Sequence, residues 1–95
     1  MGEIEGSRAI AAERARLQLG VIRAVVNARN DADLTQQELA DRLGLTKNQV
    51  VNMENGRAAI HASELALIAT VLGVDFAELW RRILVFKVPR RSNRG

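Results

Sequence analysis

A cluster of amide side chains beside one lysine falls within a short stretch of the chain. Asn48, Asn52 and Asn55 accompany Gln49 and Lys47. Asparagine is a mediocre helix former, so stability alone does not favour three of them on an exposed helix face. Each amide pairs a donor with an acceptor, which matches the edge of adenine, and lysine matches the O6 and N7 acceptors of guanine. The cluster suits base recognition, and the alternative is an ordinary polar face in contact with solvent.

Other reactive residue types form no recognisable catalytic or metal site. His61 and Glu64 are three positions apart, but two ligands do not complete a metal site, and His61 is better explained as the start of a helix. No serine has a nearby base, the glycines form no phosphate-binding loop, and the chain has no cysteine. We expect no enzymatic activity, no metal and no other cofactor.

Charge is unevenly distributed along the chain. All 11 acidic residues lie at or before Glu78, whereas Arg90 and Arg91 belong to a basic tail, residues 87–95. Such a tail suggests a polyanionic partner, nucleic acid before an anionic membrane, although it also suits a tail that only increases solubility. The longest apolar stretch without a charge, residues 65–74, is about half as long as a membrane-spanning helix. We expect a soluble cytoplasmic protein of one domain with no membrane contact.

Three similar patterns predict the beginnings of helices. In each, a capping residue precedes by three positions an acid or amide that can return a hydrogen bond to the backbone of the cap. The pairs are Thr35 with Glu38, Thr46 with Gln49, and Asp75 with Glu78. Each cap stabilises its helix by about 1 kcal/mol. The patterns predict helices that begin at residues 36, 47 and 76.

Three glycines predict where helices end. Gly44, Gly56 and Gly73 each follow an apolar periodic segment and suit the left-handed conformation that ends a helix. Apolar residues also recur at helical spacing over residues 8–29. The sequence therefore predicts five helices, at residues 8–29, 36–43, 47–55, 63–72 and from residue 76 onward, in an all-α fold.

Only three residues, the first of them Gly44, separate the second and third predicted helices. Two short helices joined by such a turn form a helix-turn-helix arrangement, in which the second helix is presented to the major groove of DNA. Leu39, Ala40 and Leu43 on the second helix, and Val50 and Met53 on the third, would face the core. This orientation leaves the amide cluster on the surface that meets DNA.

The motifs of this region resemble a known family. The run LTQQELADRLGLTKNQVVNMENGR, followed by ELALIATVLGVDFAELW, resembles the phage-repressor and Cro type of helix-turn-helix domain, also called the xenobiotic-response-element family. The resemblance covers roughly residues 17–82. It implies a compact five-helix, lambda-repressor-like domain at residues 17–86 that binds operator DNA as a dimer. Residues 1–16 would form an N-terminal extension at the start of the long first helix, and residues 87–95 the basic tail.

Individual roles follow from the exposed face and from the resemblance. We expect base contacts from Thr46, Lys47, Asn48, Gln49, Val51 and Asn52. The resemblance implies phosphate contacts from Gln36, Asn55 and Arg57, and the charge of the tail predicts more from Arg90 and Arg91. The resemblance also implies that Arg29 pairs with Glu54 of the E-N-G motif.

Three positions depart from the family pattern. Asp33 stands where relatives often have glycine, so the loop before the second helix is expected to differ in shape. Val51 is apolar where many relatives place a polar reader. Residues 58–62 lack the proline that many relatives have.

The sequence therefore predicts a transcriptional regulator that binds double-stranded DNA at specific sequences. We expect a repressor that binds a palindromic operator as a homodimer. Two half-sites would lie one helical turn, about 34 Å, apart. The residues near the end of the chain that are expected to contact the second subunit are Trp80, Ile83, Leu84 and Phe86. This apolar segment has a composition typical of a strand, and it also suits packing against the first helix. Residues 80–88 and the N-terminal extension equally suit contact with a toxin protein, so the alternative is an antitoxin that represses its own promoter.

Overall fold

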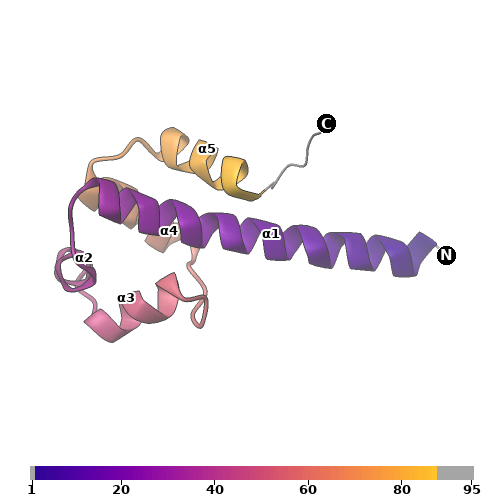
Figure 1. The fold of residues 1–95 in the computed structure, drawn as a ribbon, viewed down its shortest axis with the longest axis horizontal. Helices are drawn as coiled ribbons and strands as arrows, with labels where there is room; N and C mark the ends of the chain where they lie inside the picture. The colour runs from indigo at the N-terminus through magenta and orange to yellow at the C-terminus, as the bar shows by residue number, and fades with distance from the viewer. Residues whose placement is uncertain (1, 88–95) are drawn as a thin grey trace.

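Five α-helices make up the described part of the chain (Figure 1). The structure is a computed structural model that describes residues 2–87, and the side chains of residues 6–85. The helices are α1 (Gly2–Asp31), α2 (Gln36–Leu43), α3 (Lys47–Glu54), α4 (Ala62–Leu72) and α5 (Phe76–Lys87). Residues 2–87 contain no strand, and none of their helices is long and apolar enough to cross a membrane. The predicted all-α fold is confirmed.

Two of the three predicted cap patterns, at Thr35 and Thr46, form their hydrogen bonds. Helix α5 also begins at the predicted residue, but Glu78 pairs with Arg81 rather than with the cap at Asp75. The Thr35 hydroxyl accepts from the Glu38 backbone N–H at 3.0 Å, and the Glu38 carboxylate accepts from the Thr35 N–H at 2.8 Å. Thr46 and Gln49 repeat the exchange at 3.1 and 2.8 Å. These bonds satisfy backbone donors that the first turn of a helix leaves without partners, so α2 and α3 begin at the predicted residues.

Two segments differ from the sequence predictions. Helix α1 begins at Gly2, before the predicted start at residue 8, because Gly6 and the serine after it weaken a helix without ending it. The apolar segment at residues 83–88 has a composition that suits a strand, but residues 83–87 are the last part of α5, and residue 88 lies outside the described residues. This part of α5 is helical because Ile83 packs against α1.

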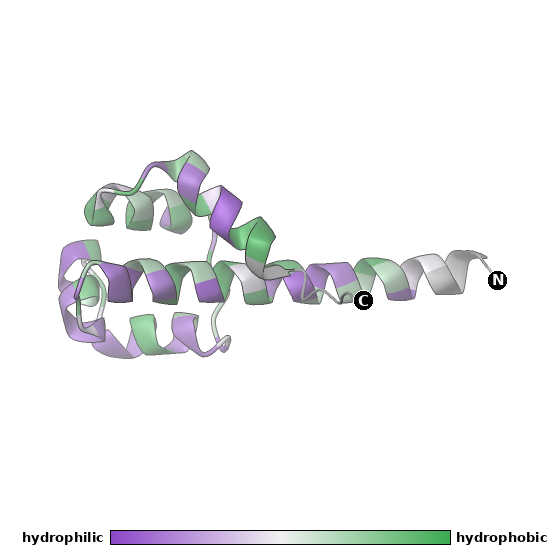
Figure 2. Ribbon diagram, turned by 45° about the horizontal axis from the view of Figure 1, so that its top comes forward, coloured by the Kyte–Doolittle hydropathy of each residue, from purple (hydrophilic) through white to green (hydrophobic). Residues whose placement is uncertain are grey.

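Apolar side chains from all five helices meet in one core. Its buried members are Ala24, Val25, Ala28, Leu39, Ala40, Val50, Met53, Leu65, Ile68, Ala69, Leu79 and Ile83. Four of the five residues predicted to face the core from the second and third helices are among them, and the fifth, Leu43, is partly buried and packs against them. Figure 2 shows hydrophobic residues along the inner faces and hydrophilic ones along the outer faces. The core therefore fixes which side of α3 is exposed.

Helix α5 packs closely against α1 at Gly20. A Cβ atom at this position would lie 2.5 Å from the carbonyl oxygen of Ile83, closer than real contacts allow. Ile83 is only 1% exposed, so this predicted dimer-contact residue belongs to the core of its own chain. Trp80 and Leu84 are 48% and 41% exposed. Phe86 lies in α5, but its side chain is outside the described residues.

We expect Gly20→Ala to destabilise the domain by about 1–3 kcal/mol, because the added methyl group must push the backbone of α5 away from α1. The measurement is thermal unfolding followed by circular dichroism. Gly6→Ala is the matched control. No atom lies within 4 Å of a Cβ built at Gly6, so that variant should be as stable as the parent chain or up to about 1 kcal/mol more stable. Equal melting temperatures for the two variants would contradict the close approach.

Candidate nucleic-acid interface

Helices α2 and α3 form a helix-turn-helix on the side of α1 opposite α5 (Figures 1 and 2). Gly44 ends α2 with a φ of 70°, and the backbone N–H of Leu45 donates to the carbonyl of Ala40 at 2.9 Å. Thr46 then caps α3. The left-handed glycine and the threonine cap set the direction in which α3 leaves the turn. Because Val50 and Met53 are buried, the opposite side of α3 faces outward.

The predicted base-reading residues divide into two groups. Lys47 and Asn48 are exposed, Asn52 is half-buried, and none of the three side chains forms a hydrogen bond within residues 6–85. The side chains of Thr46 and Gln49 are exposed but take part in the α3 cap. Val51 is half-buried. The first three side chains thus retain their full hydrogen-bonding capacity for a ligand.

A partly buried ion pair attaches the C-terminal end of α3 to α1. Arg29 donates from Nε and Nη2 to the two carboxylate oxygens of Glu54, at 2.7 and 3.0 Å. The side chains are only 12% and 6% exposed. Arg29 Nη1 also donates to the carbonyl of Leu34 at 2.7 Å, which fixes the loop before α2. The pairing that the resemblance implies is therefore present in the structure.

Gln36, expected to contact a phosphate, belongs to the same cluster. Its Nε2 donates to Glu54 Oε1 at 2.9 Å, so α2 begins against the carboxylate that ends α3. This bond joins residues 18 positions apart. The Gln36 amide has a second N–H, because a primary amide carries two donors. The hydrogen bond therefore orients Gln36 and leaves one N–H of its amide available for a ligand.

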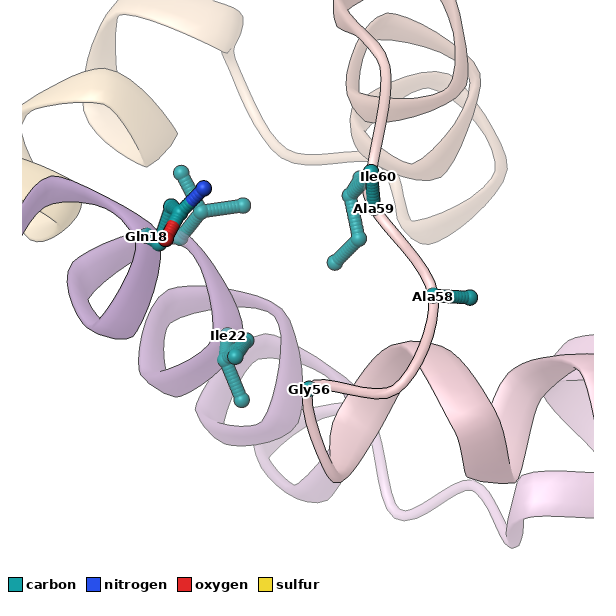
Figure 3. Close-up of a pocket in the computed structure, with 7 residues that line it drawn as sticks. Gln18, Ile22, Gly56, Ala58, Ala59 and Ile60 are labelled. Atoms are coloured by element: carbon teal, nitrogen blue, oxygen red, sulfur yellow. The ribbon is translucent and has the colours of Figure 1, made fainter. Parts of the chain in front are cut away.

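The loop after α3 presents the other phosphate candidates. Asn55 Oδ1 accepts from the backbone N–H of Arg57 at 3.0 Å, and both residues are exposed. Gly56 between them has a φ of 83°, and the end of the Ile22 side chain lies 3.3 Å from the place of its absent Cβ. A hollow of about 270 Å³ separates the rest of this loop from α1 (Figure 3), and Ala58, Ala59 and Ile60 line it with Gln18 and Ile22. The loop thus touches α1 at Gly56, next to Arg57.

Arg90 and Arg91, the phosphate candidates of the basic tail, lie outside the described residues.

Asp33 occupies the left-handed position of the loop before α2. Its φ is 59°, a conformation that aspartate tolerates better than most residues and glycine adopts without strain. A left-handed backbone at this position explains why relatives often have glycine there. Asp33 adopts the same conformation, so the expected difference in loop shape does not extend to this backbone angle.

Glu64 is a residue whose environment the sequence did not predict. Its Oε2 is buried and accepts no hydrogen bond within the described chain. Glu64 lines a hollow of about 230 Å³ together with Gln49, Asn52 and His61. No group of three potential metal ligands occurs among the described residues. The sequence indicates only that Glu64 lies near His61, because the proximity of Glu64 to α3 depends on how α4 packs in the fold.

Glu78 on α5 forms a solvent-exposed ion pair with Arg81. It accepts a hydrogen bond from Arg81 at 2.7 Å and lies 3.5 Å from Arg82. The hydrogen bond and the charge of Arg81 hold the pKa of Glu78 below its ordinary value. Solvent screens this pair, in contrast to the pair under α3.

We expect Glu54→Ala to destabilise the domain by about 3 kcal/mol, because it leaves the guanidinium of Arg29 partly buried without its partner. Thermal and urea unfolding measure the effect. Glu78→Ala removes an arginine-paired carboxylate that solvent screens, and its melting temperature should stay close to that of the parent chain. A melting temperature that Glu54→Ala leaves unchanged would show that the pair contributes nothing to stability.

Comparisons with known proteins agree with this geometry. A family model described as helix-turn-helix matches residues 26–79, more than half of the chain. The fold is similar to that of the clp gene regulator ClgR from C. glutamicum, with a TM-score of 0.72 and 22% identity over 78% of this chain and 96% of that chain. An XRE-family like protein from Pseudomonas syringae pv. tomato str. DC3000 has a TM-score of 0.69 and 28% identity, over 84% of this chain and 94% of that chain.

No curated protein matches the chain. The family match nevertheless spans α2 and α3, the loop after them and the Arg29–Glu54 pair. The five-helix order and the exposed outer face of α3 are those of a module that presents one helix to the major groove. The chain therefore belongs to the helix-turn-helix family, in its xenobiotic-response-element branch, and is a DNA-binding transcriptional regulator.

Proposed function

We propose that the protein is a repressor that binds a palindromic operator as a homodimer. Occupancy of the operator, rather than chemistry, would block transcription. The observation that carries the proposal is the outer face of α3, where Lys47, Asn48 and Asn52 are oriented by the core and have no hydrogen-bond partners among the described side chains. Amide and ammonium groups held in this way match the donors and acceptors of base edges in the major groove.

The residues around α3 serve to position it on the duplex. Gln36 at the start of α2, with Asn55 and Arg57 after α3, contact phosphates on either side of the groove. Thr46 and Gln49 combine base contact with the cap, which holds both side chains in fixed orientations. Val51 contacts a thymine methyl group. Phosphate contacts set the register, and base contacts set the sequence.

A homodimer is needed because one helix-turn-helix reads only a few base pairs. Of the residues expected at the contact, Trp80 and Leu84 are exposed on α5. Phe76 stacks on Trp80, with ring centroids 6.5 Å apart and an interplanar angle of 18°. This stripe of large apolar side chains on α5 is a suitable contact between two subunits.

The same stripe supports a second candidate function. An exposed aromatic pair with aliphatic neighbours also suits a different protein, and an antitoxin would bind a toxin there while α3 binds the promoter. Co-expression with the neighbouring gene distinguishes the two. An untagged protein that co-purifies stoichiometrically, and is lost with Trp80→Ser, supports the antitoxin.

We expect Asn48→Ala to weaken operator binding by about 1–3 kcal/mol and to relax the preference at particular base pairs. The operator is first selected from a pool of random duplexes, and binding is then measured by fluorescence anisotropy at fixed salt. Random duplex DNA is the control, because a lost base contact leaves nonspecific affinity unchanged. If affinity for operator and random DNA falls equally, Asn48 contacts only the backbone.

A second prediction concerns the salt dependence of binding. Residues 34–57 carry equal numbers of acidic and basic residues, so the motif itself supplies little attraction to a polyanion. Residues 87–95 carry Lys87, Arg90, Arg91 and Arg94 without an acid. Deleting them should lower the slope of log affinity against log salt by up to roughly 3 to 4, since each neutralised phosphate contributes about 0.9. The preferred sequence should be retained. An unchanged slope would mean that the tail does not touch DNA.

A further inference from the structure

The N-terminal part of α1 extends well beyond the other helices (Figure 1). We call residues 2–17 the overhang. From Gly6 to Leu19 every side chain is exposed or half-buried, and Gly20 is the first buried residue. A lone helix of about 15 residues is marginal in water, and glycine in the overhang weakens it further. The overhang therefore gains little stability from packing against the rest of the described chain.

An apolar stripe continues from the core onto the overhang. Ile10 and Leu17 are seven positions apart and lie on the face of α1 that also carries Val21 and Ala24. Ile10 is nevertheless 58% exposed. It lines a shallow, mostly apolar hollow of about 360 Å³ together with Glu13, Arg14, Leu17, Gln18 and Val21. The apolar face that α1 buries in the core thus continues onto the overhang, where Ile10 remains exposed.

The charge order along the overhang favours one kind of partner. Residues 2–9 carry Glu3, Glu5 and Arg8, a net charge of −1, and residues 11–17 carry Glu13, Arg14 and Arg16, a net charge of +1. When two such helices cross antiparallel at Ile10, the acidic end of each lies beside the basic end of the other. A parallel arrangement would place like charges together, which is unfavourable. The segment is thus complementary to itself in the antiparallel direction.

We infer that the overhang pairs antiparallel with the overhang of a second copy of this chain, with Ile10 next to the two-fold axis. The inference rests on the proposed homodimer and adds a surface to it. Helix α5 runs toward the base of the overhang (Figures 1 and 2), and its Ile83 meets α1 at Gly20, so the proposed contact on α5 lies close to the new surface. Both surfaces then belong to one continuous interface.

The pairing is compatible with two recognition helices on one duplex. Ile22 contacts Gly56, two residues after the end of α3. From Ile10 to Ile22 the helix rises by about 18 Å at roughly 1.5 Å per residue, so two copies in line place the ends of α3 about 36 Å apart. One helical turn of DNA separates half-sites by about 34 Å. The overhang is therefore long enough to place the two helices at half-sites one turn apart.

Single cysteines test this arrangement, because the natural chain has none. Ile10→Cys should form a disulfide-linked dimer under mild oxidation, since the two-fold axis brings the two sulfur atoms together. Ala12→Cys, exposed and displaced from the apolar stripe, is the matched control and should remain largely unlinked. Sedimentation equilibrium gives the second measurement. Ile10→Asp should raise the dimer dissociation constant at least tenfold, whereas Ala12→Asp should leave it unchanged.

The outcomes separate this inference from the proposed function. If Ile10→Cys does not cross-link and Ile10→Asp remains dimeric while Leu84→Asp dissociates, the homodimer stands and the overhang is not its contact. If the natural chain is a monomer both free and on operator DNA, the homodimer itself is wrong and the inference falls with it. Circular dichroism checks that each variant folds. Because Ile10 is exposed, its substitution should leave the melting temperature of the domain unchanged.

Discussion

The carboxylate of Glu54 is the point at which the DNA-binding half of the molecule is held together. It receives hydrogen bonds from Arg29 on α1 and from Gln36 at the start of α2, while it lies itself in the last residue of α3. Helix α3 has only eight residues, too few for an isolated helix to be stable. Its orientation therefore depends on the threonine cap at one end, the core beneath it and this carboxylate at the other end.

Local interactions explain why so much of the fold could be predicted. The caps at Thr35 and Thr46 join residues three positions apart, and the core positions of α2 and α3 follow helical periodicity. The features that the sequence did not indicate are long-range. The need for glycine at position 20 arises from Ile83, and the orientation of Gln36 arises from Glu54. Pairing of Arg29 with Glu54 was expected only because the motifs resemble those of a family.

The proposed interface combines a side chain held by hydrogen bonds with side chains that are free to change conformation. Gln49 is restrained by the cap, where its Oε1 accepts from the Thr46 N–H, so it presents its remaining amide donors in one direction. Lys47 and Asn48 are exposed and unrestrained, and they would lose conformational freedom in the proposed complex. Preorganised groups lose less entropy on binding, while mobile ones adapt to the base edge. Their combination favours a defined docking register with adjustable contacts inside it.

Helix α1 connects the recognition site to the proposed dimer surface without a break. Its C-terminal end holds Arg29 beneath α3, its middle packs against α5 at Gly20, and its N-terminal part is the overhang. An uninterrupted helix transmits orientation, whereas a flexible linker would let each α3 turn independently. The angle at which two overhangs cross would therefore fix the angle between the two recognition helices. A change in that crossing angle alters operator spacing with no change in any residue that touches DNA.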